Sequence, residues 1–388
     1  MSEWQSPPAL PSAASDSTRP QTSNWRSAPF VIASLGWLLV TAICTLNFLF
    51  AVVLLSEGEV ISALINCLYG TLVFWIFGSS VIGVPMIFLA VRALERRDFL
   101  QAERYLNGYV STVKKMRLHQ DGNLPVAKAN LALIKLVRGD YHEAELLYED
   151  LIASLSKKRK VNKHSLTAVY LNNLACVKVA QACSHAELFD LELLEAERLA
   201  NEALTIWQGA GGVKKDQGGA AYPLQVLAEI DVLRGNLDNA ERKFAEVLKL
   251  NAVGKQSLFI LPEARQGLYF ESHLWLCYLY LLQENREAAD QLCQRLISEL
   301  RLRPAPVFQH SLAILSRIAA HYVQSHDWPM AERVLEQAYA IARIYPLHPE
   351  APQIALSYEK LLEATDRSAE INEMKLWVRP VLELAQEE

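Results

Sequence analysis

The chain lacks the short motifs that mark common catalytic centres. It contains no HExxH zinc motif, no GxSxG nucleophile turn and no GxGxxG loop. The glycine-rich stretch at 208–219 lacks the Lys-Ser/Thr ending of a phosphate-binding loop. The nine histidines are scattered, and His321 and His326 lie on either side of a predicted turn. We therefore expect no enzymatic activity, no cofactor and no metal site, and the sequence identifies no small-molecule substrate.

Cysteine is scarce, with six residues in a chain of 388. Cys44 and Cys67 fall within apolar runs, and Cys176 and Cys183 are seven residues apart on one predicted helix. That separation corresponds to ~10.5 Å along a helix, which is too far for a disulfide. We interpret these cysteines as reduced core residues.

Charged residues are absent from two long runs, residues 29–55 and 60–91. Each run exceeds the ~20 residues that a helix needs to cross a bilayer. No small-residue cleavage site follows the first run, so the segment does not read as a removable signal peptide. The sequence therefore predicts a transmembrane helical hairpin at 29–94, with spans at about 29–55 and 60–93.

Basic residues are distributed unequally around the two predicted spans. Residues 92–117 carry seven Lys or Arg side chains, whereas the loop at 56–60 carries none and has two Glu. By the positive-inside rule, both termini are then cytoplasmic. We expect an integral protein of a bacterial inner membrane, preceded by a flexible, Ser- and Pro-rich tail at 1–28.

A repeated phrase dominates the rest of the chain. The stretches RGDYHEAELLY at 138–148 and RGNLDNAERKF at 234–244 each place a polar turn before an apolar-periodic helix with an Ala near its start. Aligning on that Ala finds six copies, separated by 42, 52, 44, 49 and 42 residues: Ala102, Ala144, Ala196, Ala240, Ala289 and Ala331. A first helix with a small residue near its middle precedes most turns. This pattern predicts a helical-hairpin repeat.

At these positions the sequence resembles the tetratricopeptide repeat (TPR) family. The residue pairs that match its first helix are Leu174-Ala175, Leu227-Ala228, Leu276-Cys277 and Ile318-Ala319. The long repeat spacing and the phrase YLNNLA at 170–175 are similar to the kinesin-light-chain variant. The resemblance implies an all-α, right-handed superhelical solenoid at 95–388 with C-terminal capping helices. Residues 183–190 read as an insertion, and 208–219 as a long loop.

The resemblance also implies a concave, peptide-binding groove lined by first helices. Carried onto this chain, its ligand-facing positions are Asn130, Asn172, Asn173, Tyr222, Gln225, Glu229, Tyr278 and Arg317. An Asn amide offers a donor and an acceptor together, which suits a peptide backbone. The alternative for each Asn is a hydrogen bond within its own repeat.

One dense basic patch stands in the run SKKRKVNKH at 156–164, with Lys157, Lys158, Arg159 and Lys160 at its centre. Such a patch suits anionic lipid head groups or nucleic acid. No aromatic residues interleave with the basic ones, and the net charge is -5. We therefore read it as a solvated loop and expect no nucleic-acid partner.

These features together indicate a scaffold rather than a catalyst. The hairpin fixes the protein in the lipid bilayer, and the solenoid binds protein or peptide partners and assembles or regulates a complex at the cytoplasmic face. The alternative is an accessory subunit of a membrane enzyme or of a transport or biogenesis machine, which contacts its partner through the hairpin.

Overall fold

The computed structural model describes residues 49, 52–53, 86–94, 98–115, 123–156, 163–209, 217–253, 262–302, 311–343, 345, 348–367 and 370–371. The chain divides into two compact units, one formed by 1–93 with 108–121 and the other by 94–107 with 122–388. Throughout the described segments the regular secondary structure is helical, without a strand.

In the first unit, residues 86–93 are helical and Ala90 is fully buried. A Cβ atom built on Gly108 would lie 2.6 Å from Cε of Met86, so these two parts of the unit pack closely. Within the part of the chain that the structure describes, no helix is both long and apolar enough to cross a membrane. The predicted tail at 1–28 and nearly all of the two predicted spans lie outside the described residues. The transmembrane hairpin stays a prediction.

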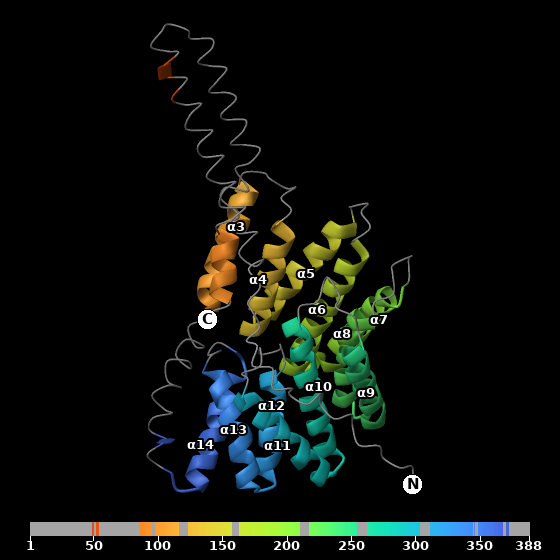
Figure 1. Ribbon diagram of the computed structural model, residues 1–388, viewed down its shortest axis with the longest axis vertical. Coiled ribbons are helices and arrows are strands. Elements are labelled where there is room, and N and C mark those ends of the chain that lie inside the picture. The colour runs from red at the N-terminus through yellow and green to blue at the C-terminus, as the bar shows by residue number, and fades with distance from the viewer. Residues whose placement is uncertain are drawn as a thin grey trace, which may run out of the picture. The chain divides into compact units, whose positions relative to one another are not determined.

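The second unit is a succession of antiparallel helical hairpins (Figure 1). After α3 (Phe99–Lys115), which contributes residues to both units, come α4 (Leu124–Arg138), α5 (Tyr141–Ser156), α6 (Lys163–Ser184), the 3-10 helix η2 (Ala186–Leu188), α7 (Phe189–Trp207), α8 (Gln217–Leu233), α9 (Leu237–Val253), α10 (Pro262–Leu282), α11 (Arg286–Leu302), α12 (Ser311–Gln324), α13 (Trp328–Ala342) and α14 (Ala351–Ala364). The first helices α6, α8, α10, α12 and α14 contact one another in turn, and the second helices pack outside them. The expected all-α architecture of stacked helical hairpins is therefore confirmed.

Small residues mark the helix crossings, as the sequence predicts. All six aligned alanines have no exposed surface. Their counterparts on first helices are equally buried, namely Ala132, Ala175, Ala228, Cys277 and Ala319. A small side chain at a crossing lets two helix axes approach to ~8–10 Å, and a larger neighbour such as Phe244 fills the groove beside it.

Four of the hairpin turns contain a residue in the left-handed backbone conformation. Gly139, Gly235, Glu284 and His326 have φ angles of 87°, 78°, 58° and 56°, and each lies five residues before a crossing alanine. The left-handed residue lets the chain leave a helix while the next amides still bond back to its last turn. At Gly139, for example, the amide donates to the Leu136 carbonyl at 3.2 Å. The equal spacing explains why the aligned phrase recurs.

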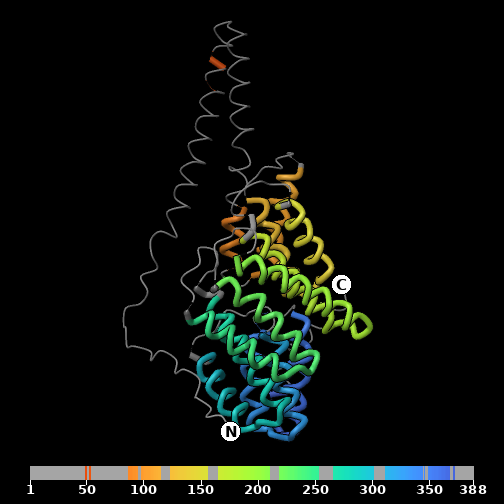
Figure 2. Tube along the Cα trace, turned by 90° about the vertical axis from the view of Figure 1, so that its right-hand side faces the viewer, coloured from red at the N-terminus to blue at the C-terminus, as the bar shows by residue number. Residues whose placement is uncertain are grey.

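The hairpin of α6 and α7 departs from this pattern. Leu191, five residues before Ala196, lies inside α7 instead of in a turn. The chain continues along α6 to Ser184 and reverses through η2, within the stretch 183–190 that the sequence predicts as an insertion (Figure 2). The predicted long loop at 208–219 is shorter than expected, because α8 begins at Gln217 and continues the helix through Gly219.

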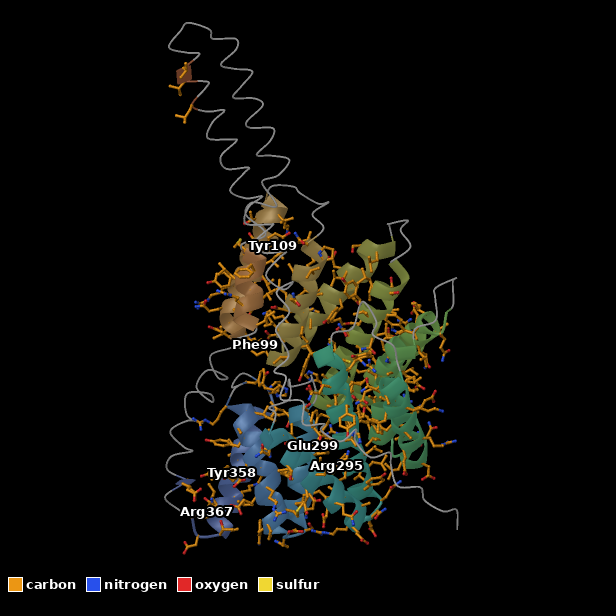
Figure 3. All side chains as sticks on the ribbon, in the orientation of Figure 1. Phe99, Tyr109, Arg295, Glu299, Tyr358 and Arg367 are labelled. Atoms are coloured by element: carbon orange, nitrogen blue, oxygen red, sulfur yellow. The ribbon has the colours of Figure 1, made fainter. Side chains whose placement is uncertain are left out.

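The last hairpin meets the first repeat across the second unit. The rings of Phe99 and Tyr345 lie 5.2 Å apart, and Phe99 and Val137 pack against the core built from the C-terminal helices. Phe99 is labelled in Figure 3. A Cβ atom on Gly139 would lie 2.7 Å from Cγ of Pro349. Tyr345 and Pro349 thus form a closing joint with the start of the solenoid.

Candidate functional site

The inner helices carry the residues that the sequence predicts for a groove, but three of the eight are buried and the other five are only partly exposed. Gln225 and Glu229 on α8 are only 3% and 2% exposed, and Asn172 on α6 is 7% exposed. Asn130 and Tyr222 are half-buried. The expectation of an exposed row of ligand contacts therefore needs correction, because neighbouring inner helices pack over these positions.

A buried polar cluster joins α8 to α10. The Gln225 side-chain amide donates to Oε1 of Glu229 at 3.0 Å, and the Ser272 hydroxyl donates to Oε1 of Gln225 at 2.6 Å. Glu271, next to Ser272 in α10, is 1% exposed. The second oxygens of Glu229 and Glu271 find no hydrogen-bond partner among the described residues. Two carboxyl groups are thus held in the interior with incomplete hydrogen bonding.

Burial governs how these carboxyls ionise. Removal from water raises the pKa of Glu229 to about 7, against the opposing influence of Gln225, Trp275 and Arg317. The pKa of Glu271 is raised well above 4.5 by burial and by the negative charge of Glu229. We therefore expect the pair to keep a proton at neutral pH. Sequence reasoning missed Glu271, although a Glu within the largely apolar α10 was the available signal.

Arg317 on α12 bridges the inner helices. Its Nη2 lies 3.2 Å from Sγ of Cys183, at the end of α6, and its guanidinium carbon lies 5.8 Å from the ring centroid of Trp275 on α10. Among the described residues, the side-chain hydrogen bond of Arg317 is the one to Cys183, and its positive charge opposes the rise in the pKa of Glu229 and of Glu350. Its guanidinium keeps donor capacity for another group.

A pocket of about 410 Å³ opens beside Arg317. Its lining residues come from α8, α9, α10, α12 and one turn, and they are Val232, Leu233, Gly235, Leu237, Tyr278, Leu282 and Arg317. Aliphatic walls surround one guanidinium and one phenol, a composition that binding pockets favour. Two of the eight predicted groove residues, Tyr278 and Arg317, therefore face an accessible hollow.

The paired asparagines on α6 behave differently from each other. The Asn173 amide donates to the hydroxyl of Tyr148 on α5 at 3.4 Å. Because α5 belongs to the preceding hairpin, this hydrogen bond joins two repeats and is not the bond within its own repeat that the sequence left open. Asn172 keeps its side-chain oxygen buried, and no hydrogen bond to that oxygen is formed by the described residues.

The remaining sequence predictions concern the basic run and metals. Lys157, Lys158, Arg159 and Lys160 lie outside the described residues. Among the residues that are described, no three His, Cys, Asp or Glu side chains are grouped as a metal site would require.

Comparison with solved structures finds helical repeat proteins. BtubC (BKLC) from P. vanneervenii is 17% identical with a TM-score of 0.43, over 63% of this chain and 90% of that one. A tetratricopeptide repeat protein from Parabacteroides merdae is 16% identical with a TM-score of 0.36, over 76% and 98%. The TPR-like repeats of a putative kinesin light chain from Podosopora anserina are 19% identical with a TM-score of 0.35, over 56% and 93%.

No protein-family model and no curated protein matches the chain. These structural similarities are low, so the fold assignment depends on the helix packing described above.

Proposed function

We propose that this protein is a membrane-anchored scaffold that binds protein partners through the pocket at Tyr278 and Arg317 and assembles or regulates a complex. Helical-repeat solenoids present extended surfaces to other proteins rather than catalytic centres, which supports this assignment. The two uncharged runs at 29–55 and 60–91 support anchoring at the cytoplasmic face of a bacterial inner membrane. We propose no enzymatic activity.

The pocket carries the proposal. Arg317 places a charged donor in a mainly aliphatic hollow, and its side-chain hydrogen bond among the described residues is the one to Cys183. A guanidinium in such surroundings gains from a hydrogen-bond acceptor supplied by a bound segment, because a charge-assisted hydrogen bond is stronger than one between neutral groups. The aliphatic walls bury an apolar side chain of the same segment.

The buried carboxyl pair does not compete with this site as a reaction centre. Glu229 and Glu271 are 2% and 1% exposed, and neither lines the pocket. A general acid or base must reach the atom whose proton it transfers. We assign the pair a structural role within the inner helices.

Partner capture tests the proposal. The full chain is purified in mild detergent with its bound partners, as wild type and as Arg317→Ala with Tyr278→Ala. We expect this double change to reduce the recovered partner several-fold or more. The matched control is Glu241→Ala with Lys249→Ala on α9, which alters no pocket residue and should leave capture unchanged.

The same experiment separates the scaffold from the accessory subunit. Partners that remain bound to residues 1–98 alone, and are kept by the Arg317 and Tyr278 variant, would contradict the scaffold and favour contact through the hairpin.

Membrane topology is tested separately. A reporter fused after Glu388 should be active only in the cytoplasm, and one inserted at Gly58 only outside it. The reverse pattern would contradict the proposed orientation.

A further inference from the structure

The α6–α7 hairpin has a projecting tip, defined here as residues 183–194. Four other hairpins reverse at a left-handed residue five positions before the crossing alanine, whereas this hairpin continues past that point and reverses through η2. The tip lacks the left-handed turn residue of those four hairpins, and none of its residues lines the pocket. It therefore calls for a separate explanation.

Three leucines lie exposed on the tip. Leu188, Leu191 and Leu194 are 39%, 62% and 61% exposed. Leu191 and Leu194 are three residues apart in α7, so they share one face of that helix. The opposite face is already filled, because Leu193 and Ala196 are fully buried. The exposed leucines do not contribute to the solenoid core.

Equivalent positions in other hairpins show that the repeat does not require these leucines. Leu194 lies two residues before its crossing alanine. The corresponding residues in four other hairpins are His142, Asp238, Glu287 and Pro329. The copy aligned on Ala102 has Leu100 at this place, and that side chain is 48% exposed, so four of the six copies manage without an aliphatic residue here and two carry an exposed leucine.

The base of the tip is firmly held. Lys178 of α6 pairs with Glu145 at 2.6 Å and with Glu192 at 3.0 Å, and the Gln181 amide donates to Glu145 at 2.8 Å. These contacts join α5, α6 and α7 directly below the exposed leucines. The leucines are presented on a preorganised support, which lowers the entropic cost of binding.

Acidic residues surround the leucines. Glu187 and Asp190 are exposed, and within the described residues neither has a Lys or Arg at ion-pair distance; His185 lies 3.9 Å from Glu187. Arg198, one turn after Leu194, is already paired with Glu195 and Glu202. Negative charge beside an apolar patch opposes contact with anionic lipid and favours a basic partner.

We propose that the projecting tip is a second docking surface, which binds an amphipathic helix of a partner protein with an aliphatic stripe flanked by Lys or Arg. The leucines bury the stripe, and Glu187 and Asp190 pair with the flanking cations. The surface is separate from the pocket at Tyr278 and Arg317, so the scaffold holds two partners at once.

A displayed library tests this surface. Its members are short helices with a fixed leucine stripe and randomised flanking positions, selected on the full chain in detergent. We expect enrichment of Lys and Arg at the flanks. The enriched helices should bind Leu191→Ser with Leu194→Ser about tenfold more weakly, and Glu187→Lys with Asp190→Lys should shift the preference toward acidic flanks.

The control removes two exposed aliphatic side chains elsewhere, Val126→Ser with Leu356→Ser, and should bind the enriched helices like the wild type. The proposal is overturned if no helix is enriched, if the flanks show no basic preference, or if the tip variant binds equally well. It is also overturned if sedimentation shows a dimer that the tip variant dissociates, because a second copy is then the occupant. A failure of partner capture through Arg317 leaves this result unaffected.

Discussion

The joints between successive hairpins and the closing joint, in which Tyr345 and Pro349 meet the first repeat, are built in different ways. Between hairpins, an alanine at each crossing is fully buried, and the device recurs at Ala102, Ala144 and every later copy. The closing joint instead uses contacts between residues far apart in the sequence, such as Phe99 with Tyr345 and Gly139 with Pro349.

The difference between the two kinds of joint shows which parts of the packing depend on neighbouring residues and which depend on the whole solenoid. Each crossing alanine affects the packing of only one or two hairpins. The sequence of each copy therefore determines how its own helices pack. The closing joint depends on the accumulated curvature of all the hairpins. The three predictions below test whether the two kinds of joint are energetically distinct.

The largest effect is expected at a repeat joint. Ala240→Leu or Ala331→Leu inserts a larger side chain where no space is exposed, and should lower the free energy of unfolding by about 1–3 kcal/mol or more. Chemical denaturation followed by circular dichroism measures the change. Ala245→Leu, at an exposed position of α9, is the matched control and should be nearly neutral. Equal stability of all three variants would show that the assigned crossings are wrong.

The next effect concerns the carboxyl pair enclosed by the inner helices. Because the folded chain raises the pKa of Glu229 from 4.5 to about 7, the native state binds its proton more tightly than the unfolded state does. The free energy of unfolding should therefore fall as pH rises from about 4.5 to about 7, by roughly 1.4 kcal/mol per pH unit for such a group. Glu229→Gln with Glu271→Gln should flatten this slope.

Denaturation at several pH values between 4 and 8 checks the carboxyl prediction. Glu241→Gln on α9 serves as the control and should keep the slope of the wild type. A slope that survives replacement of both inner carboxyls would mean that other groups cause it and that the pair is not enclosed.

The smallest effect separates the closing joint from an ordinary turn. Gly139 and Gly235 both have positive φ, so Ala at either position costs roughly 1–2 kcal/mol of backbone strain. Nothing lies within 4 Å of a Cβ at Gly235, whereas a Cβ at Gly139 meets Pro349 at 2.7 Å. Gly139→Ala should be the more destabilising by about a further 1 kcal/mol.

A double-mutant cycle isolates the contribution of Pro349. Removing the proline ring with Pro349→Ala should bring the cost of Gly139→Ala down to that of Gly235→Ala, as thermal or chemical denaturation would show. Equal costs in the presence of Pro349 would contradict the closing joint.

Helical architecture, crossing register and the departure from the repeat at 183–190 were all readable from the sequence. Each depends on a few neighbouring residues: the apolar period, the small residue at the crossing and the left-handed turn five positions before it. Local propensity and nearest-neighbour packing determine these features, and the residues responsible recur in each hairpin. Burial of Ala240 and Ala331, for example, follows from the repeat alone.

Only the tertiary structure decided which inner residues remain accessible. Sequence placed Glu229 and Arg317 on the same inner face but could not show that Glu229 is enclosed while Arg317 borders a pocket. Arg317 reaches Cys183, which lies 134 residues earlier in the chain. Exposure at the inner face depends on how closely the inner helices converge, and this convergence sums small rotations over every hairpin, a quantity that no local pattern specifies.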